Sequence, residues 1–243
     1  MKLKSAYSIC LIMFCLFLRA FAEDMPLIEW SRSDNAEKMV CEFSNPTIET
    51  AVREAIGITN GPIYSSDLER LEELFLDHRE IEDISDLSKL TSLKFLTIAH
   101  NNLVDITPLS ALTSLENLRV DENAISDLSP LSGLTNLREL WLNDNEISDI
   151  SPISGLTKLK TLYLGNNQVT NIAPLSSMKE LEVLWLDNNG ISEITPLTSL
   201  TKLTQLNLQD NVVRNISAVK KLTNMVDINF WNNQISDISP LSI

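Results

Sequence analysis

Leucine recurs through the C-terminal two thirds of the chain at a fixed spacing of 22 residues. Within each unit, apolar and polar positions alternate over a few residues, as around Leu140 and Leu142, and this alternation predicts a short strand. A unit of this size cannot bury its apolar face alone, so we expect successive units to stack into a solenoid with a parallel sheet on the concave face. One register with this spacing consists of Leu71, Leu93, Leu115, Leu137, Leu159, Leu181, Leu203 and Met225.

Two further columns of residues predict how each coil turns. An asparagine follows every predicted strand except the first, where Arg79 takes its place. The side-chain amide of such an asparagine, directed inward, can form hydrogen bonds with backbone groups of the turn that have no partner in the sheet. We therefore expect the first coil to be irregular. A column of prolines in the return segment argues against a long convex helix and for 3₁₀ or extended turns. The columns are Asn101, Asn123, Asn145, Asn167, Asn189, Asn211 and Asn233, and Pro108, Pro130, Pro152, Pro174, Pro196 and Pro240.

A helical segment precedes the repeats. Asn45 before Pro46 is a helix start, because an asparagine N-cap accepts from the first amides and proline suits the first turn. Gly57 ends the helix, and its apolar stripe is Ile48, Ala51, Val52, Ala55 and Ile56. We divide the chain into residues 1–22 as a signal peptide, 23–39 as a flexible lead, 40–70 as a helical N-terminal cap, and 71–243 as eight coils of 22, the last incomplete.

At this point the motifs resemble a known family. The segments Asn123–Leu137 and Asn145–Leu159 share the pattern N-x-I-S-D-I-S-P-L-S-G-L-T-x-L with small variations, which is similar to the internalin-type leucine-rich repeats of secreted and surface-attached bacterial proteins. The segment Cys41–Leu76 resembles the helical cap of such proteins. The resemblance implies an α/β leucine-rich repeat solenoid and extracytoplasmic, noncatalytic binding. It implies no ligand, because members of the family differ in what they bind.

The first residues indicate export. Lys2 and Lys4 precede the apolar stretch 5–18, and Ala20 and Ala22 are small residues at the positions that a signal peptidase reads, so cleavage before Glu23 is expected. The mature protein would be secreted, periplasmic or on the cell surface. No other segment approaches the ~18 apolar residues of a membrane span.

The formal charge of the chain is −14. A nucleic acid is not an expected partner, because such binding depends on clustered basic residues, and here lysine and arginine are scattered. A recurrent aspartate column favours a solvated convex rim, with cation binding as the alternative: Asp105, Asp127, Asp149 and Asp237. Cys41 would be the single cysteine after signal cleavage, either buried as a small hydrophobe or available for an intermolecular bridge.

The sequence contains no motif of a nucleophile, a phosphate loop or a metalloprotease, so we predict neither an enzyme nor a cofactor. His78 and His100 are 22 residues apart, in one column with Glu122 and Asp144. Two imidazoles on neighbouring coils could hold zinc, but two exposed histidines at a variable position are the favoured interpretation, and we predict no metal site.

The outward concave positions carry the information about binding. Three consecutive coils place Trp141, Tyr163 and Trp185 at the same position, and adjacent strands are ~4.8 Å apart, so these rings should form a ladder. Contiguous exposed aromatics are typical of recognition surfaces, and cross-strand packing is the competing explanation. We predict a protein-binding site made of Trp141, Tyr163, Trp185, Arg119, Glu139, Asn143, Val183 and Asp187. Carbohydrate binding and a structural or assembly role are the alternatives.

The eighth coil has no further unit after it in this sequence. A terminal parallel strand presents an unpaired edge, and Ile228, Phe230, Ile235, Ile238 and Leu241 would have apolar surface with nothing stacked on it. Self-association through the C-terminal coils, fraying of the last coil and truncation of a longer ancestor compete as explanations. We expect association or fraying.

Overall fold

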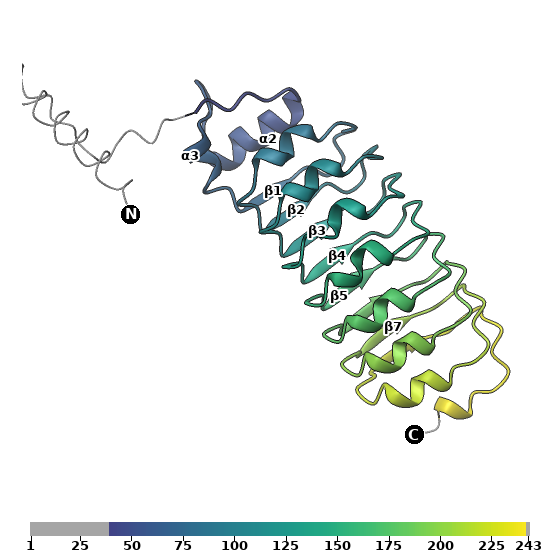
Figure 1. The fold of residues 1–243 in the computed structure, drawn as a ribbon. Coiled ribbons are helices and arrows are strands. Elements are labelled where there is room, and N and C mark those ends of the chain that lie inside the picture. The colour runs from purple at the N-terminus through teal and green to yellow at the C-terminus, as the bar shows by residue number, and fades with distance from the viewer. Residues whose placement is uncertain (1–38, 242–243) are drawn as a thin grey trace, which may run out of the picture. The chain divides into compact units, whose positions relative to one another are not determined.

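The computed structural model describes residues 39–241. Eight short strands form one parallel sheet, with the strands arranged in chain order, and each strand returns through a short 3₁₀ helix on the opposite side of its coil (Figure 1). The predicted solenoid is confirmed. The strands are β1 Glu73–Phe75, β2 Phe95–Thr97, β3 Asn117–Arg119, β4 Glu139–Trp141, β5 Thr161–Tyr163, β6 Val183–Trp185, β7 Gln205–Asn207 and β8 Asp227–Asn229.

Every strand pairs with the next at an offset of one repeat. Leu118 is opposite Leu140 and Arg119 is opposite Trp141, and the same step continues along the whole sheet. Each column of the sequence therefore becomes a row of side chains across the sheet. The central leucine of β1 to β7 points inward and is buried, so the residues on either side of it face the concave surface.

The return segments adopt 3₁₀ turns, as the proline column predicted. The ring of proline fixes φ and removes a backbone donor, so a proline near the start of each turn is compatible with one short turn and not with a long helix. Six of these turns carry proline at the first or second position. The turns are η1 Ser85–Lys89, η2 Thr107–Ala111, η3 Ser129–Leu131, η4 Ser151–Gly155, η5 Ala173–Ser177, η6 Thr195–Ser199, η7 Ser217–Lys221 and η8 Ser239–Leu241.

The asparagine column forms a continuous ladder of hydrogen bonds. Asn145 is typical: its Oδ1 accepts from the backbone N–H of Ile125 at 3.0 Å, and its Nδ2 donates to three backbone carbonyls at 3.1 to 3.2 Å. In the first coil Arg79 cannot do this, and Glu80 adopts a φ of 54° that no equivalent residue of the later coils adopts. The predicted irregularity of that coil is confirmed.

The helical cap consists of α2 Pro46–Ile56 and α3 Ser65–Leu68. Asn45 is the N-cap of α2 and accepts from the amides of Thr47 and Ile48, while Gly57 ends the helix with a φ of 72°. Both helix boundaries are as the sequence predicted. Cys41 is partly buried against the same core.

Asp86 attaches the cap to the first coil, which the sequence analysis did not anticipate. Its buried carboxylate accepts from the backbone N–H groups of Ser44 at 2.7 Å and Asn45 at 2.8 Å, and from the ammonium of Lys89 at 2.6 Å. Burial raises the pKa of Asp86, but these hydrogen bonds outweigh it and leave the pKa below its ordinary value. The carboxylate is therefore held in its ionised form.

The far end of the solenoid is less covered. Ile228, Phe230 and Ile235 are only partly buried, and the exposed fractions of Val226, Trp231 and Ile238 are 83%, 67% and 70%. The predicted signal peptide, residues 1–22, and all but the last residue of the predicted lead lie outside the described residues. Within residues 39–241, no helix is both long and apolar enough to span a bilayer.

Candidate binding surface

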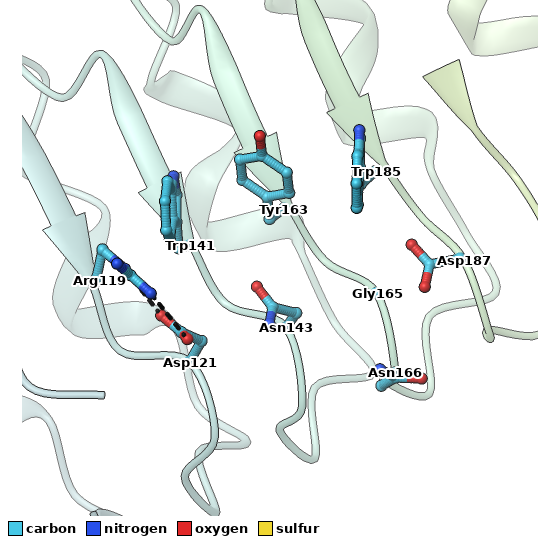
Figure 2. A pocket seen from close by; sticks show the side chains of 9 residues that line it. All are labelled: Arg119, Asp121, Trp141, Asn143, Tyr163, Gly165, Asn166, Trp185 and Asp187. Atoms are coloured by element: carbon cyan, nitrogen blue, oxygen red, sulfur yellow. Dashed lines mark hydrogen bonds and ion pairs between the residues drawn. The ribbon is translucent and has the colours of Figure 1, made fainter. Parts of the chain in front are cut away.

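Three aromatic side chains form a ladder across the middle of the concave face. Trp141 on β4, Tyr163 on β5 and Trp185 on β6 occupy equivalent positions in paired strands. Neighbouring ring centroids are 5.1 and 5.2 Å apart, and the ring planes are inclined by 70° and 67°, so the packing is edge to face. This geometry is the favourable one for aromatic pairs, and it makes the three rings one contiguous surface (Figure 2).

Arg119 covers one end of the ladder. The Cζ atom of its guanidinium lies 3.8 Å from the ring centroid of Trp141, which is a close cation–π contact. The buried carboxylate of Asp121 holds the guanidinium in place, with both N···O distances at 3.4 Å. The chain thus supplies its own cation at this end, together with a compensating carboxylate (Figure 2).

Asp187 lies at the other end of the ladder. Its Oδ1 accepts from the side-chain amide of Asn207 at 3.1 Å, and no lysine or arginine among residues 39–241 forms an ion pair with it. Burial raises the pKa of Asp187, and the negative charges of Asp144 and Asp210 raise it further. The ionised carboxylate is therefore less favourable here than in water.

The carboxylate of Asp187 leans over Gly165 on the neighbouring coil. A Cβ atom at Gly165 would lie 2.7 Å from Oδ1 and 2.9 Å from Cγ of Asp187. These distances are too short for the Cβ atom and the carboxylate to occupy these positions together. The missing side chain therefore leaves the space that the carboxylate and the adjoining pocket occupy. Figure 2 shows the carboxylate directed toward this gap.

An open pocket with a volume of about 330 Å³ connects these groups. Six of the eight predicted site residues line it, whereas Glu139 and Val183 lie on the same sheet outside it. Three lining residues, Asp121, Gly165 and Asn166, were not part of the predicted site. Gly165 could have been noticed, because the equivalent residues of the neighbouring coils are Asn143 and Asp187, which both have polar side chains. The lining residues are Arg119, Asp121, Trp141, Asn143, Tyr163, Gly165, Asn166, Trp185 and Asp187.

The three rings differ in burial, which corrects the expectation that all of them face solvent. Trp185 is 41% exposed, whereas Trp141 and Tyr163 are half-buried between their neighbours. The indole N–H of Trp141 is buried without a hydrogen-bond partner in the described part of the chain. A stranded donor of this kind costs free energy, so packing for stability alone does not account for a tryptophan at this position.

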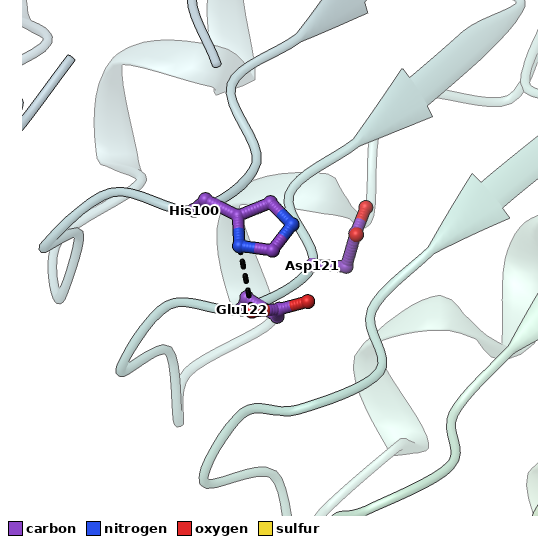
Figure 3. A group of neighbouring side chains, drawn as sticks. All are labelled: His100, Asp121 and Glu122. Atoms are coloured by element: carbon purple, nitrogen blue, oxygen red, sulfur yellow. Dashed lines mark ion pairs between the residues drawn. The ribbon is translucent and has the colours of Figure 1, made fainter. Parts of the chain in front are cut away.

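The histidine column forms a second polar cluster, beside the Arg119 end of the pocket. The rings of His78 and His100 are stacked, with their centroids 4.0 Å apart. Nδ1 of His100 also lies 2.6 Å from a carboxylate oxygen of Glu122, a contact that Figure 3 shows. One ligand atom each of His100, Asp121 and Glu122 lie within 4.8 Å of one another. Asp121 rather than Asp144 completes the group, and its carboxylate is already bound by Arg119.

Comparison with known proteins identifies the repeats and the architecture. The model of paired leucine-rich repeats matches six overlapping segments that together span residues 69–221. The structure is similar to internalin C2 of Listeria monocytogenes, with 35% identity, a TM-score of 0.81, and coverage of 82% of this chain and 89% of that chain. Internalin F of the same organism shares 31% identity with a TM-score of 0.70, over 82% of this chain and 66% of that chain.

A more distant likeness extends to plant receptors. The ectodomain of the receptor kinase GASSHO1/SCHENGEN3 from Arabidopsis thaliana, in complex with CASPARIAN STRIP INTEGRITY FACTOR 2, shares 27% identity with a TM-score of 0.59, over 66% of this chain and 21% of that chain. No curated protein sequence matches the chain. The matched repeats and the likeness to internalin C2 over most of both chains show that this chain belongs to the internalin-type leucine-rich repeat family.

Proposed function

We propose that this chain is an exported, noncatalytic binding protein that recognises a protein partner through the pocket on its concave face. The observation that carries the proposal is the ladder of Trp141, Tyr163 and Trp185, which forms one surface with Arg119 at one end and Asp187 at the other. Central aromatic anchors beside charged groups are the usual energetic centre of a protein interface. Leucine-rich repeat relatives among plant receptors, such as GASSHO1/SCHENGEN3 with its factor, also support protein binding.

The ring geometry favours a protein over a carbohydrate. A sugar stacks on the open face of a ring, but Arg119 already covers one face of Trp141, and edge-to-face packing partly buries Tyr163. Trp185 alone is more than one third exposed. A protein segment can use the edges of the rings together with the neighbouring amides and carboxylates, so it fits this surface better than a stacked glycan.

The test is a binding comparison between the parent and the double variant Trp141→Ala with Trp185→Ala. The repeats serve as bait for material from the surroundings of the producing organism, and affinities for each captured protein are then measured by calorimetry. We expect a loss of at least ~2 kcal/mol in the double variant, as for other aromatic anchors. Phe75→Ala is the matched control, because Phe75 is an exposed aromatic side chain at the equivalent position of β1, three coils from Trp141 and outside the pocket.

Two results would contradict the proposal. One is equal affinity of the parent and the double variant, provided that urea denaturation shows both to be folded. The other is capture of a glycan and no protein by the parent, with loss of that glycan in the double variant. The export part is tested separately, by N-terminal sequencing of the protein outside the cell, for which we expect Glu23 as the first residue.

Self-association is a second interaction that we propose, through the last coil. Its support is the exposure of Val226, Trp231 and Ile238 together with the unpaired edge of β8 within the described chain. Light scattering coupled to size exclusion, run over a dilution series, tests it. A monomer at every concentration would contradict this proposal and leave the concave site untouched.

A further inference from the structure

We propose that the Asp187 end of the pocket binds one cationic side chain of the protein partner, a lysine ammonium or an arginine guanidinium, between the carboxylate and the rings of Tyr163 and Trp185. The proposal rests on the proposed function and deepens it, because it names the chemistry that this part of the surface recognises. The chain already contains an arrangement of this kind at the opposite end of the ladder.

At that opposite end, a cation, a carboxylate and an indole lie together. Arg119 contacts the ring of Trp141, and Asp121, two residues further along the same coil, holds the guanidinium. Asp187 stands in the same column as Asp121, three coils further on, and again follows the outward position of its strand by two residues. That outward position holds Trp185 instead of an arginine. The Asp187 end therefore repeats the carboxylate and the aromatic rings without the cation.

The pocket also has room for the missing group. Gly165 lies between Asn143 and Asp187 in the row of residues that follows the strands, and it is the one member of this part of the row without a side chain. The gap opens below Tyr163 and Trp185 (Figure 2). Because a single methyl group there would collide with the carboxylate of Asp187, the glycine keeps the carboxylate accessible from the pocket.

The charge around the pocket favours a cation. Asp187 has a neutral amide partner, Asn207, and its further charged neighbours Asp144 and Asp210 are negative. The ionised form of a carboxylate is less favourable when it is partly buried next to like charges than when it is in water, and a cation bound beside the carboxylate offsets this free-energy cost. The aromatic faces attract the same ion, and the attraction increases when a partner excludes water. The net charge of −14 attracts basic partners over a longer range.

A protein side chain fits better than a free small ion. The pocket is open, with a volume of about 330 Å³, and so small an ion makes too few contacts there to bind tightly by itself. A side chain presented by a partner is instead immobilised by the rest of the interface. Arginine and lysine both satisfy the requirement, and the experiment separates them.

The experiment uses side-chain analogues as probes of the full exported chain. n-Butylammonium and n-butylguanidinium chloride are titrated at constant ionic strength and followed by tryptophan fluorescence and by the indole N–H signals in NMR spectra, with n-butanol as the neutral analogue. We expect saturable binding of at least one cation in the millimolar range, and none of butanol, up to about 100 mM. Equal binding of the cations and butanol, or no saturation by either cation, would overturn the proposal.

Two variants locate the site. Asp187→Asn keeps the shape and removes the charge, and Gly165→Ala places a methyl group against the carboxylate; each should weaken cation binding about tenfold. Asp149→Asn is the matched control, because it makes the same change in charge at an exposed position just before η4, where the next coil already has Asn171 in the same role. Binding to the parent should also weaken as the pH falls and Asp187 becomes protonated, and this pH dependence should be absent from Asp187→Asn. A parental pH profile that Asp187→Asn reproduces would place the cation elsewhere.

The same variants separate this proposal from the proposed function. If a captured protein loses affinity for the double tryptophan variant but binds Asp187→Asn as tightly as the parent, the concave site is correct and the cationic side chain is wrong. If the tryptophan variant binds normally, the proposed function fails whatever the probes do. A capture that depends on Asp187 but yields an amino sugar polymer instead of a protein would overturn the assignment to a protein side chain.

Discussion

Replacement of single asparagines in the ladder should destabilise the solenoid by amounts that follow from how many backbone groups each one satisfies alone. Asn145→Ala removes four hydrogen bonds. Three of them end on backbone carbonyls that keep another donor. The carbonyl of Val120 still accepts from Nδ2 of Asn123, and the carbonyl of Leu142 still accepts from Nδ2 of Asn167. The carbonyl of Asn143 still accepts from the backbone N–H of Glu122 in the preceding coil. Only the buried N–H of Ile125 loses its acceptor, so the expected loss is about 1 to 3 kcal/mol.

Asn101→Ala should cost more. Its Oδ1 accepts from both Arg79 at 3.1 Å and Ile81 at 2.9 Å, and its Nδ2 is the donor to Leu76 at 2.9 Å, whose carbonyl has no second donor within residues 39–241. Three backbone groups are stranded instead of one, because Arg79 replaces the asparagine of the first coil. The expected loss is about 3 to 5 kcal/mol, with the partly exposed Arg79 amide contributing least.

Asn233→Ala should cost least, below about 1 kcal/mol, because Asn233 is only half-buried and water can replace its amide. The assay is urea denaturation followed by circular dichroism, with the slope of the transition compared between variants. The predicted order of destabilisation is Asn101, Asn145, Asn233. An unchanged midpoint for Asn145→Ala, or a larger loss there than for Asn101→Ala, would refute the idea that stranded backbone groups set the cost.

Three further substitutions test the electrostatics and the pocket. Trp141→Phe keeps an aromatic ring beside Arg119 and removes the unpaired N–H, so the free energy of unfolding should stay the same or rise by up to ~1 kcal/mol. A clear decrease of this free energy, measured by urea denaturation, would show that the N–H has a partner. Asp86→Ala should cost at least ~2 kcal/mol, because two backbone donors lose their acceptor. The lowered pKa of Asp86 means that its contribution is present above pH 3.8 and is lost as the pH falls below that value, so the gap between variant and parent should narrow in acid. The effect of pH on the contribution of Asp187 is the reverse: because its pKa is raised, its ionisation lowers the stability of the fold as the pH rises above 3.8. In thermal melts Asp187→Asn should therefore be at least as stable as the parent at pH 7 and should lose that advantage at pH 3.

The architecture could be predicted from the sequence because each coil repeats the same physical constraints. A spacing of 22 residues fixes which side chains are neighbours across the sheet, so that Arg119 opposite Trp141 follows from addition alone. Proline fixes the turn type, and asparagine satisfies the turn backbone. The attachment of the cap by Asp86 was missed, although Asp86 replaces proline in the proline column and so marked the first coil as different.

The pocket could be predicted only in part. The row of Trp141, Tyr163 and Trp185 follows from the repeat spacing. The burial of each ring, however, depends on the orientation of the neighbouring side chains, which the amino-acid sequence does not state directly. Glu139 and Val183 flank the ladder in sequence yet lie outside the pocket. Gly165 matters through the side chain it lacks, which becomes visible only when the carboxylate of Asp187 is placed next to it.

In a repeat protein the coils serve as an alignment of the chain with itself, so positions that repeat and positions that depart from the repeat should have separable roles. Asn145 belongs to a column that is the same in every coil but the first, and it hydrogen-bonds to backbone alone, whereas Trp185 belongs to a column that varies along the chain and lines the pocket. Asn145→Ala should therefore weaken folding without changing affinity for the partner, and Trp185→Ala should do the reverse. The double variant should show both losses in full, within ~0.5 kcal/mol, since the two side chains share no partner. A coupling well above that value, measured in denaturation and calorimetry on all four proteins, would mean that the coil backbone transmits the change and that the two sets of positions are not independent.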